Sequence, residues 1–213
     1  MADVTAAMVK ELREETGAGM MDAKRALVES QGNKEKAKDL LRAKGLSRAA
    51  GLTGRATAEG AVDAYIHHAG GIATQGALVE LNCETDFAAK SEDFRHLAHT
   101  LALQVVGATP QYIRREDVPA DVVEREKNVY RAQIEGKPAN IVEKILEGKL
   151  NDFYSKVCLL EQPWIKDDKK RVGDLVTEAV SKLRENITVA GFARFEVGEA
   201  AIVRTNASAQ SSQ

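Results

Sequence analysis

Asp86 and Phe87 place an acid beside a large aromatic residue where one sequence pattern gives way to another. Residues 78–83 alternate between apolar and polar types, which predicts a strand with one apolar face. Thr85 or Ser91 can cap the helix expected next, because each side-chain oxygen can accept a hydrogen bond from a backbone N–H. Phe87 therefore stands at a strand-to-helix corner, from which side chains can project. The alternative is that Phe87 is an ordinary core aromatic.

Other residues that could carry chemistry form no catalytic pattern. His96 and His99 share one helix face and could suit a metal, but no nearby acid completes a ligand set, so exposed helix histidines are favoured. The glycines between 70 and 76 lack the lysine that a phosphate-binding loop needs. Nucleophile–base motifs are also missing from the sequence. We expect no catalytic residue, no metal and no cofactor.

Composition narrows the class of protein. The chain has 213 residues, with 30 basic and 32 acidic side chains and a formal charge of −2. A dedicated nucleic-acid binder is usually clearly basic, so we expect no direct nucleic-acid contact. Two cysteines without CxxC spacing favour a reduced compartment. Without a long apolar run, the sequence predicts neither a secretory signal nor a membrane span.

The first 45 residues predict a small helical bundle. Apolar stripes indicate helices over 5–16, 20–30 and 34–44, the last ending at Gly45 as its C′ residue. Residues 46–59 are rich in glycine and small side chains and predict a linker. This stretch and the helix before it carry four basic residues, which either contact an acidic surface or RNA or simply keep a tether solvated. The four are Arg42, Lys44, Arg48 and Arg55.

Residues 60–199 predict a second, mixed domain. A strand over 60–68 should pair with 78–83 through a loop that runs from Gly70 to Gly76. Amphipathic helices follow, with a turn at 162–164, and a last strand covers 187–197. This order indicates an α+β fold with a three-stranded antiparallel sheet. Residues 200–213 are expected to be a disordered tail. The expected inward face of the last strand holds Val189, Gly191, Ala193, Phe195 and Val197.

Three stretches resemble one family. Residues 9–27, VKELREETGAGMMDAKRAL, are similar to the N-terminal signature of translation elongation factor Ts, and residues 81–87, LNCETDF, to its second signature. Residues 192–199, FARFEVGE, are similar to its C-terminal strand. The resemblance covers about residues 1–199, and three signatures in the same order make it specific. One departure is Ala88, where the family pattern has valine.

The resemblance implies a guanine-nucleotide exchange factor rather than an enzyme. Its partner would be elongation factor Tu, in the GDP-bound and nucleotide-free forms. Residues 1–45 would be a ubiquitin-associated-type (UBA-like) domain that docks on the GTPase. The core would insert its corner near the Mg²⁺ site of the nucleotide. The implied contacts are Leu12, Arg13, Met20 and Met21 in the first domain, and Thr85, Asp86, Phe87 and Ala88 in the core.

The remaining expectations concern assembly and location. The sequence leaves a monomer, a homodimer and a two-to-two complex with the GTPase open. The expected compartment is the cytoplasm, with the plastid stroma as the alternative for a processed organellar form. The rival from another class is an RNA- or ribosome-binding module that uses the basic linker, and its affinity would fall steeply with salt.

Overall fold

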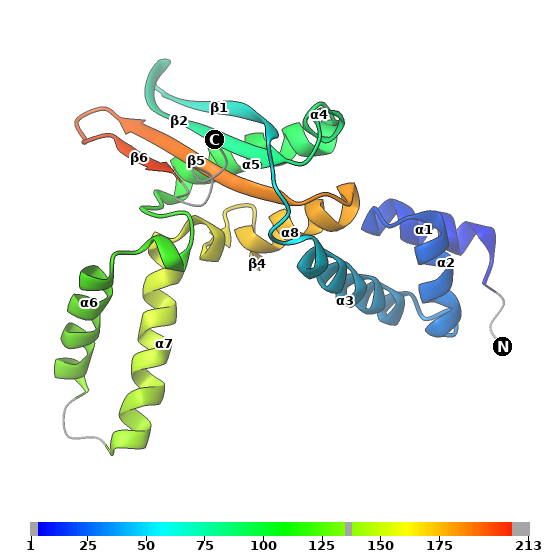
Figure 1. The fold of residues 1–213 in the computed structure, drawn as a ribbon, viewed down its shortest axis with the longest axis horizontal. Coiled ribbons are helices and arrows are strands. Elements are labelled where there is room, and N and C mark those ends of the chain that lie inside the picture. The colour runs from blue at the N-terminus through cyan, green and yellow to red at the C-terminus, as the bar shows by residue number, and fades with distance from the viewer. Residues whose placement is uncertain (1–3, 135–137, 206–213) are drawn as a thin grey trace. The chain divides into compact units, whose positions relative to one another are not determined.

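The computed structural model describes residues 4–134 and 138–205 (Figure 1). The chain divides into two compact units. The first contains Met1–Arg55 together with Thr177–Asn186, and the second contains Ala56–Val176 together with Ile187–Gln213. Each unit is built from segments that are distant in sequence. Helix α8 (Val172–Leu183) begins in the second unit and ends in the first.

The first unit is built on α1 (Ala6–Thr16), α2 (Met20–Glu29) and α3 (Lys34–Leu52). Side-chain caps start two of these helices: Thr5 accepts from the Met8 N–H in α1, and Asn33 accepts from the Lys36 N–H in α3. The apolar faces meet in one small core. Its buried members are Val9, Leu12, Ala23, Ala26, Leu27 and Ala37.

Helix α3 is longer than predicted, so the end expected at Gly45 is wrong. The helix continues to Leu52, and residues 46–52 of the expected linker are helical. A Cβ on Gly45 would lie 2.9 Å from Ser181 Oγ, in the part of α8 that belongs to this unit. Gly45 therefore permits a close helix approach, rather than the left-handed turn that usually ends a helix at glycine.

The second unit contains a four-stranded antiparallel sheet in the order β1-β2-β5-β6, one strand more than predicted. Its strands are β1 (Glu59–Ala69), β2 (Ile72–Cys83), β5 (Ile187–Glu196) and β6 (Ile202–Thr205). Strand β6 falls inside the tail that was expected to be disordered, so that expectation is wrong for these residues. The remainder of that tail, 206–213, lies outside the described residues.

The turn between β1 and β2 is tighter than predicted. Gly70 and Gly71 have φ values of 59° and 83°, and Ala69 already pairs with Ile72. Two residues with positive φ form the hairpin turn that matches the twist of the strands, and glycine adopts this conformation without steric cost. The loop expected to reach Gly76 is therefore wrong, and β2 starts at Ile72.

The predicted inward face of β5 is only partly correct, because the strand contains a β-bulge. Glu80 of β2 pairs with Gly191, but Leu81 pairs with Val189, which leaves Ala190 as an extra residue. A bulge shifts the alternation by one residue. Val189 is buried before the bulge, whereas after it Phe192 and Arg194 are buried and Phe195 is 57% exposed.

Helix α5 (Glu92–Ala108) packs against β1 and β2 and fills the core of this unit. Val79, Leu81 and Cys83 of β2 are fully buried on the inner face, as the alternation predicted. The sheet thus has one covered face, and β2, which lies between β1 and β5, is part of a rigid scaffold. The fully buried side chains of α5 include Phe94, Ala98, Leu101, Ala102 and Val105.

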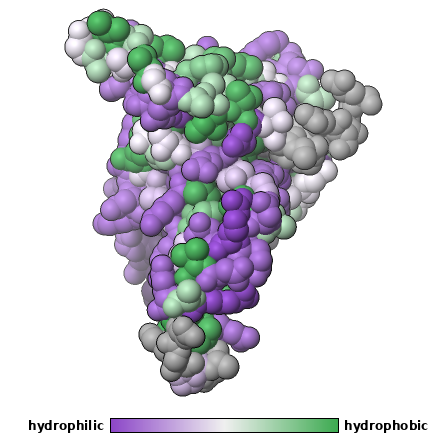
Figure 2. Space-filling view, turned by 90° about the vertical axis from the view of Figure 1, so that its left-hand side faces the viewer, coloured by the Kyte–Doolittle hydropathy of each residue, from purple (hydrophilic) through white to green (hydrophobic). Residues whose placement is uncertain are grey.

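The other face of the sheet, which we call the outer sheet face, exposes apolar side chains. Ala64, Leu78, Ala193 and Val203 are neighbours across the four strands in one row, and Ile66 and Phe195 flank Gly76 in the next. Figure 2 views the side of the molecule on which the strand turns lie and shows apolar surface at the strand end. Its exposed large residues are Val62, Ile66, Leu78, Phe195 and Val203.

A helical hairpin joins α5 to the rest of the unit. Helices α6 (Ala120–Gln133) and α7 (Ala139–Val157) lie side by side in Figure 1. Proline supplies the N-cap residue of both, where a missing N–H costs no helical hydrogen bond. Short 3-10 turns at Arg115–Asp117 and Leu159–Glu161 flank the hairpin.

A small two-stranded sheet follows, where a turn was predicted at 162–164. Strand β3 (Pro163–Trp164) pairs with β4 (Asp167–Arg171). The buried side chain of Gln104 holds this hairpin to α5: its Nε2 donates to the Pro163 carbonyl over 3.1 Å, and its Oε1 accepts from the Ile165 N–H over 3.0 Å. A buried amide with satisfied hydrogen bonds fixes the position of this segment.

Candidate functional site

The corner after β2 projects Phe87 into solvent. Strand β2 ends at the buried Cys83, and helix α4 (Asp86–Ala89) begins three residues later. Phe87 is 83% exposed, which excludes the alternative that it is a core aromatic in the free chain. A large ring held in water gains free energy only when another surface covers it. The corner has the character of a binding site.

Two hydroxyl caps fix this corner. Thr85 Oγ1 accepts from the Ala88 N–H over 3.3 Å and starts α4. Ser91 Oγ accepts from the Phe94 N–H over 3.3 Å, starts α5, and donates to the Ala88 carbonyl over 2.7 Å. The prediction that Thr85 or Ser91 caps the helix after the strand is therefore confirmed, although each of them caps a separate helix. They bind the corner to α5, so a four-residue helix is held by hydrogen bonds at both ends.

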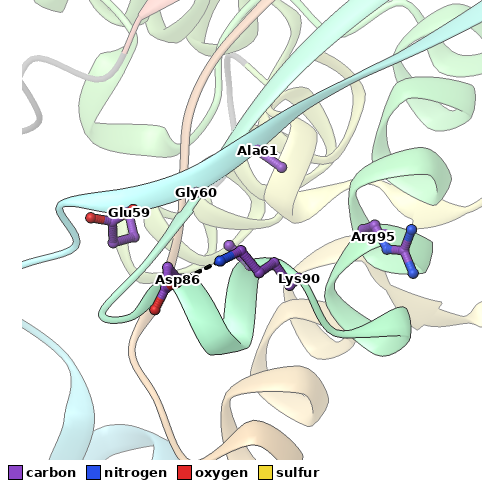
Figure 3. A pocket seen from close by; sticks show the side chains of 7 residues that line it. Glu59, Gly60, Ala61, Asp86, Lys90 and Arg95 are labelled. Carbon is purple, nitrogen blue, oxygen red and sulfur yellow. Dashed lines mark hydrogen bonds and ion pairs between the residues drawn. The ribbon is translucent and has the colours of Figure 1, made fainter.

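Asp86 is engaged in an ion pair on the same corner. Lys90 Nζ lies 2.6 Å from Asp86 Oδ2 (Figure 3). The hydrogen bond from Lys90 holds the pKa of Asp86 below its usual value, and Asp86 in turn raises the pKa of Lys90. Asp86 therefore remains a carboxylate at neutral pH, with its charge balanced by the neighbouring lysine.

A shallow hollow of about 500 Å³ adjoins Asp86. A Cβ on Gly60, in its wall, would lie 2.4 Å from the Leu81 carbonyl oxygen, so only glycine fits this close approach of β1 to β2. The hollow is lined by side chains of both charge signs. Its other lining residues are Glu59, Ala61, Asp86, Ala89, Lys90 and Arg95.

The structure brings the four predicted core residues together but gives them different surroundings. Thr85 and Phe87 are exposed and Asp86 is half-buried, whereas Ala88 is buried beneath the corner. Ala88 thus contributes packing rather than surface in the free chain. A valine here would add two methyl groups to the underside of α4 and leave the exposed ring unchanged.

The predicted residues of the first unit also separate into surface and support. Met20 is 48% exposed and Met21 is 64% exposed at the start of α2, and Arg13 is exposed on α1. Leu12 has no exposed surface and belongs to the core. We call Met20 and Met21 the methionine tip. They follow Gly17, whose φ of 66° ends α1 in a left-handed turn.

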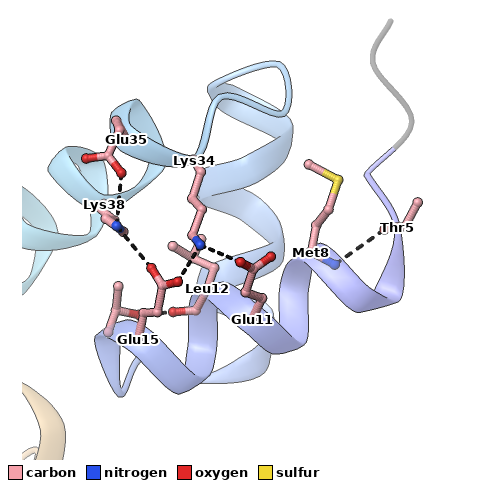
Figure 4. A network of polar contacts seen from close by, with 9 residues as sticks. Thr5, Met8, Glu11, Leu12, Glu15, Lys34, Glu35 and Lys38 are labelled. Carbon is pink, nitrogen blue, oxygen red and sulfur yellow. Dashed lines mark hydrogen bonds and ion pairs between the residues drawn. The ribbon is translucent and has the colours of Figure 1, made fainter.

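Ion pairs join α1 to α3 on this unit (Figure 4). Lys34 Nζ pairs with Glu11 at 2.6 Å and with Glu15, and Lys38 pairs with Glu15 at 3.0 Å and with Glu35 at 2.9 Å. Hydrogen bonds from Lys34 and then Lys38 hold the pKa of Glu15 below its usual value. The network closes the bundle around Leu12, which lies beneath it.

The histidines and cysteines offer no second centre of reactivity. His99 Nδ1 lies 3.1 Å from Asp63 Oδ1, and its ring contacts Tyr65 edge-on. Within residues 4–134 and 138–205, no group of three or more His, Cys, Asp or Glu side chains is placed to hold a metal ion. Cys83 and Cys158 are buried and not joined in a disulfide, and burial raises the pKa of Cys158 to about 12, so it resists ionisation.

None of the helices in the described part of the chain is long and apolar enough to cross a membrane.

One feature of the first unit was not predicted from the sequence. Asp22, directly after the methionine tip, is buried among four basic side chains. Two of these, Lys44 and Arg48, belong to the basic stretch noted in the sequence, whereas Arg25 lies on α2 itself and Arg184 lies far along the chain.

Comparison with known proteins agrees with the three sequence signatures. The profile of the family Elongation factor TS matches residues 8–199. Elongation factor Ts of Carboxydothermus hydrogenoformans is 56% identical over 198 residues, which cover 92% of this chain and 90% of that protein. Elongation factor Ts of Anaeromyxobacter dehalogenans is 55% identical over 201 residues (93% and 90%). Elongation factor Ts of Thermotoga maritima is 52% identical over 197 residues (92% and 98%). The resemblance is confirmed, and the chain belongs to the elongation factor Ts family.

Proposed function

We propose that this protein is a guanine-nucleotide exchange factor for elongation factor Tu and promotes release of GDP during translation elongation. Family membership supports a role in translation elongation. The observation that carries the exchange mechanism is the exposed ring of Phe87 on a corner fixed by two caps. Such a corner can deliver an apolar side chain into a partner without first becoming ordered.

The mechanism is displacement rather than chemistry by the factor itself. Burial of a Phe side chain is worth roughly 1.5–3 kcal/mol, and Phe87 gains this only when the GTPase covers it. Mg²⁺ demands near-ideal octahedral geometry and bridges the phosphates, so a small shift of its surroundings loosens the nucleotide. Asp86 enters beside Phe87 with its charge balanced by Lys90, which limits repulsion from the nucleotide phosphates. No residue of the factor needs to form or break a bond, and no cofactor is required.

Linkage gives the cycle its direction. If bound factor weakens nucleotide, bound nucleotide must weaken the factor by the same ratio. The factor therefore binds the GDP-bound and nucleotide-free GTPase in turn, and incoming GTP releases it. This reciprocity requires only that both ligands act on one bistable region of the partner.

The first unit supplies a second contact. The methionine tip and the Arg13 side chain are exposed on this unit, whereas Leu12 belongs to its core. Methionine is unbranched and adapts to irregular apolar surfaces. We propose that this UBA-like bundle docks on the GTPase domain, so that the Phe87 corner acts on a partner already held. The proposed location is the cytoplasm, because translation elongation takes place there and the similar proteins named above come from bacteria.

The outer sheet face favours a pair of factors within the complex. Its apolar rows cross four strands, and exposed apolar patches of this kind mark interaction sites. We propose a homodimer formed through this face, and hence two factors with two GTPases. Sedimentation should show a dimer for the wild type and a monomer for Phe195→Lys.

The rival RNA-binding function has weaker support. Of the four basic residues that suggested it, Lys44 and Arg48 pair with Asp22 inside the first unit. Their charges are thus partly balanced within the protein. An RNA contact would lose affinity steeply as salt rises, whereas a contact made by an apolar ring would change little.

One experiment tests the proposed function. Labelled GDP is loaded on elongation factor Tu, and its release is followed with and without the full-length chain at two salt concentrations. We expect release to accelerate with the concentration of the factor until it saturates. An unchanged release rate at micromolar factor would overturn the proposal, and tight salt-sensitive binding to RNA would favour the rival.

A further inference from the structure

Asp22 is a nearly buried carboxylate on which four basic side chains converge. Its side chain is 9% exposed. Its Oδ1 lies 2.7 Å from Arg25 Nη2 and 3.3 Å from Lys44 Nζ, and its Oδ2 lies 3.3 Å from Arg48 Nη2 and 3.9 Å from Arg184 Nη2. These partners come from α2, from α3 and from the residue that follows α8. All five residues belong to the first unit.

The surroundings keep this acid charged. Burial alone would raise the pKa of Asp22, but hydrogen bonds from Lys44 and Arg48 outweigh it, so the pKa lies below its usual value. A negative charge in the first turn of a helix is also favoured by the helix dipole. Removing one partner of a buried ion pair leaves the others uncompensated, so such a cluster fixes geometry strongly.

The cluster takes the place of a missing helix cap. Helices α1 and α3 each begin with a side-chain cap, whereas α2 begins at Gly19, which makes no side-chain cap hydrogen bond. Asp22 is the third residue of α2, and a Cβ on Gly19 would be 3.7 Å from Asp22 Oδ2 and 3.6 Å from Arg184 Nη2. The start of α2 is thus held by ion pairs to other segments rather than by a local hydrogen bond.

The methionine tip consists of the first two residues of α2. Met20 and Met21 immediately precede Asp22 in the first turn of α2, and their side chains are exposed while that of Asp22 points inward. We propose that Asp22 is a positioning residue for docking: it fixes the methionine tip in its binding orientation by tying α2 to α3 and to Arg184. This inference rests on the proposed function of the tip as a contact with elongation factor Tu.

The expected consequence is a change in affinity and not in the exchange step. If the tip loses its fixed orientation, the two methionines must be ordered on binding, at about 0.5–1.5 kcal/mol for each side chain. This corresponds to a roughly 5- to 150-fold rise in the factor concentration that gives half-maximal GDP release. The maximal release rate should stay unchanged, because the Phe87 corner lies in the other unit and is not altered.

The test measures GDP release against factor concentration for the full-length chain. Asp22→Asn should raise the half-maximal concentration and leave the maximal rate unchanged. Asp39→Asn removes the same charge from an exposed position on α3 and should match the wild type. Arg184→Gln, which leaves the other three partners in place, should produce a smaller rise, and Arg184→Lys should restore most of the wild-type value.

Each outcome decides one claim. A wild-type chain that does not release GDP overturns the proposed function itself. If the wild type is active and Asp22→Asn has the same half-maximal concentration as the wild type, the positioning role is overturned. A fall in the maximal release rate without a change in the half-maximal concentration overturns it as well. Melting curves accompany each variant, and if Asp22→Asn does not fold, Arg184→Gln decides: a wild-type half-maximal concentration overturns the inference.

Discussion

The Phe87 corner and the methionine tip solve the same problem in different ways. Each holds an exposed apolar side chain at the start of a helix. The corner uses local hydrogen bonds, in which the hydroxyl oxygens of Thr85 and Ser91 accept from backbone N–H groups three residues later. The tip lacks a side-chain cap and uses the charges around Asp22, which come from distant segments. The corner should therefore tolerate acid and salt, and the tip should not.

The largest expected effects come from truncating an exposed phenylalanine, which should slow GDP release, and a buried one, which should lower stability. Phe87→Ala should leave the melting temperature nearly unchanged and slow GDP release about 10- to 150-fold, as expected for roughly 1.5–3 kcal/mol of lost burial in the partner. The matched control is Phe94→Ala, three residues into α5 and fully buried, which should cost about 3–5 kcal/mol of stability. A Phe87→Ala protein that melts far below the wild type would contradict the proposal that Phe87 acts by inserting into the partner.

The next effect tests whether the stability of the first unit depends on its packing against the last part of α8. Gly45→Ala should destabilise the protein by about 1–2 kcal/mol, because the added Cβ meets Ser181 Oγ at 2.9 Å. Gly51→Ala lies on the same helix with nothing within 4 Å of its added Cβ. It should instead stabilise by about 0.5–1 kcal/mol through helix propensity. Urea unfolding of both variants measures the difference, and equal shifts would count against close packing at Gly45.

A smaller effect concerns acid. Because the pKa of Asp22 is lowered in the folded state, its contribution to stability is present above the unfolded value of 3.8 and is lost as the pH falls below it. The groups that face it are Arg25, Lys44, Arg48 and Arg184. The melting temperatures of the wild type and Asp22→Asn should thus differ at pH 6, and the difference should shrink as the pH falls below 3.8. A constant difference would show that charge is not what Asp22 supplies.

The smallest effect is expected at Lys90. Its pair with Asp86 is exposed, and exposed ion pairs contribute little to stability, so Lys90→Met should leave the melting curve unchanged. It should reduce GDP release by no more than about threefold, through the charge that approaches the partner. In the Asp86→Asn background the same substitution should have no further effect. A large loss in that background would mean that Lys90 contacts the partner directly.

The strand and caps of the Phe87 corner could be predicted because their causes are local. Alternation over 78–83 decides which side chains are buried, and a hydroxyl caps the residues that follow it. Exposure of Phe87 could not be predicted from spacing, since a core aromatic and a projecting one have the same neighbours in sequence. It is decided by α5, which fills the inner face of the sheet and leaves the corner uncovered.

The errors have causes that are distant in sequence. Gly45 has the signature of a helix end, and only Ser181 shows that it is a packing position. The two faces of β5 exchange after Ala190, because the pairing with β2 leaves this residue without a partner in the ladder. The alternation of a single strand does not determine its pairing register, so the bulge could not be predicted. Asp22 has the signature of a favourable acid in a first helical turn, and its fourth basic partner, Arg184, comes from the other end of the chain.

The composition of the first unit also sets an order of events during synthesis. Asn186 Nδ2 donates to the Arg55 carbonyl across a separation of 131 residues, and Arg184 completes the Asp22 cluster. At about 5–20 residues per second, the ribosome needs roughly 7–26 s to make the intervening chain. The helices of this bundle thus wait for a segment that is made after a long interval. We expect the nascent bundle to be a client for a chaperone during that interval, and its methionine tip reaches its final orientation only after Arg184 has been made.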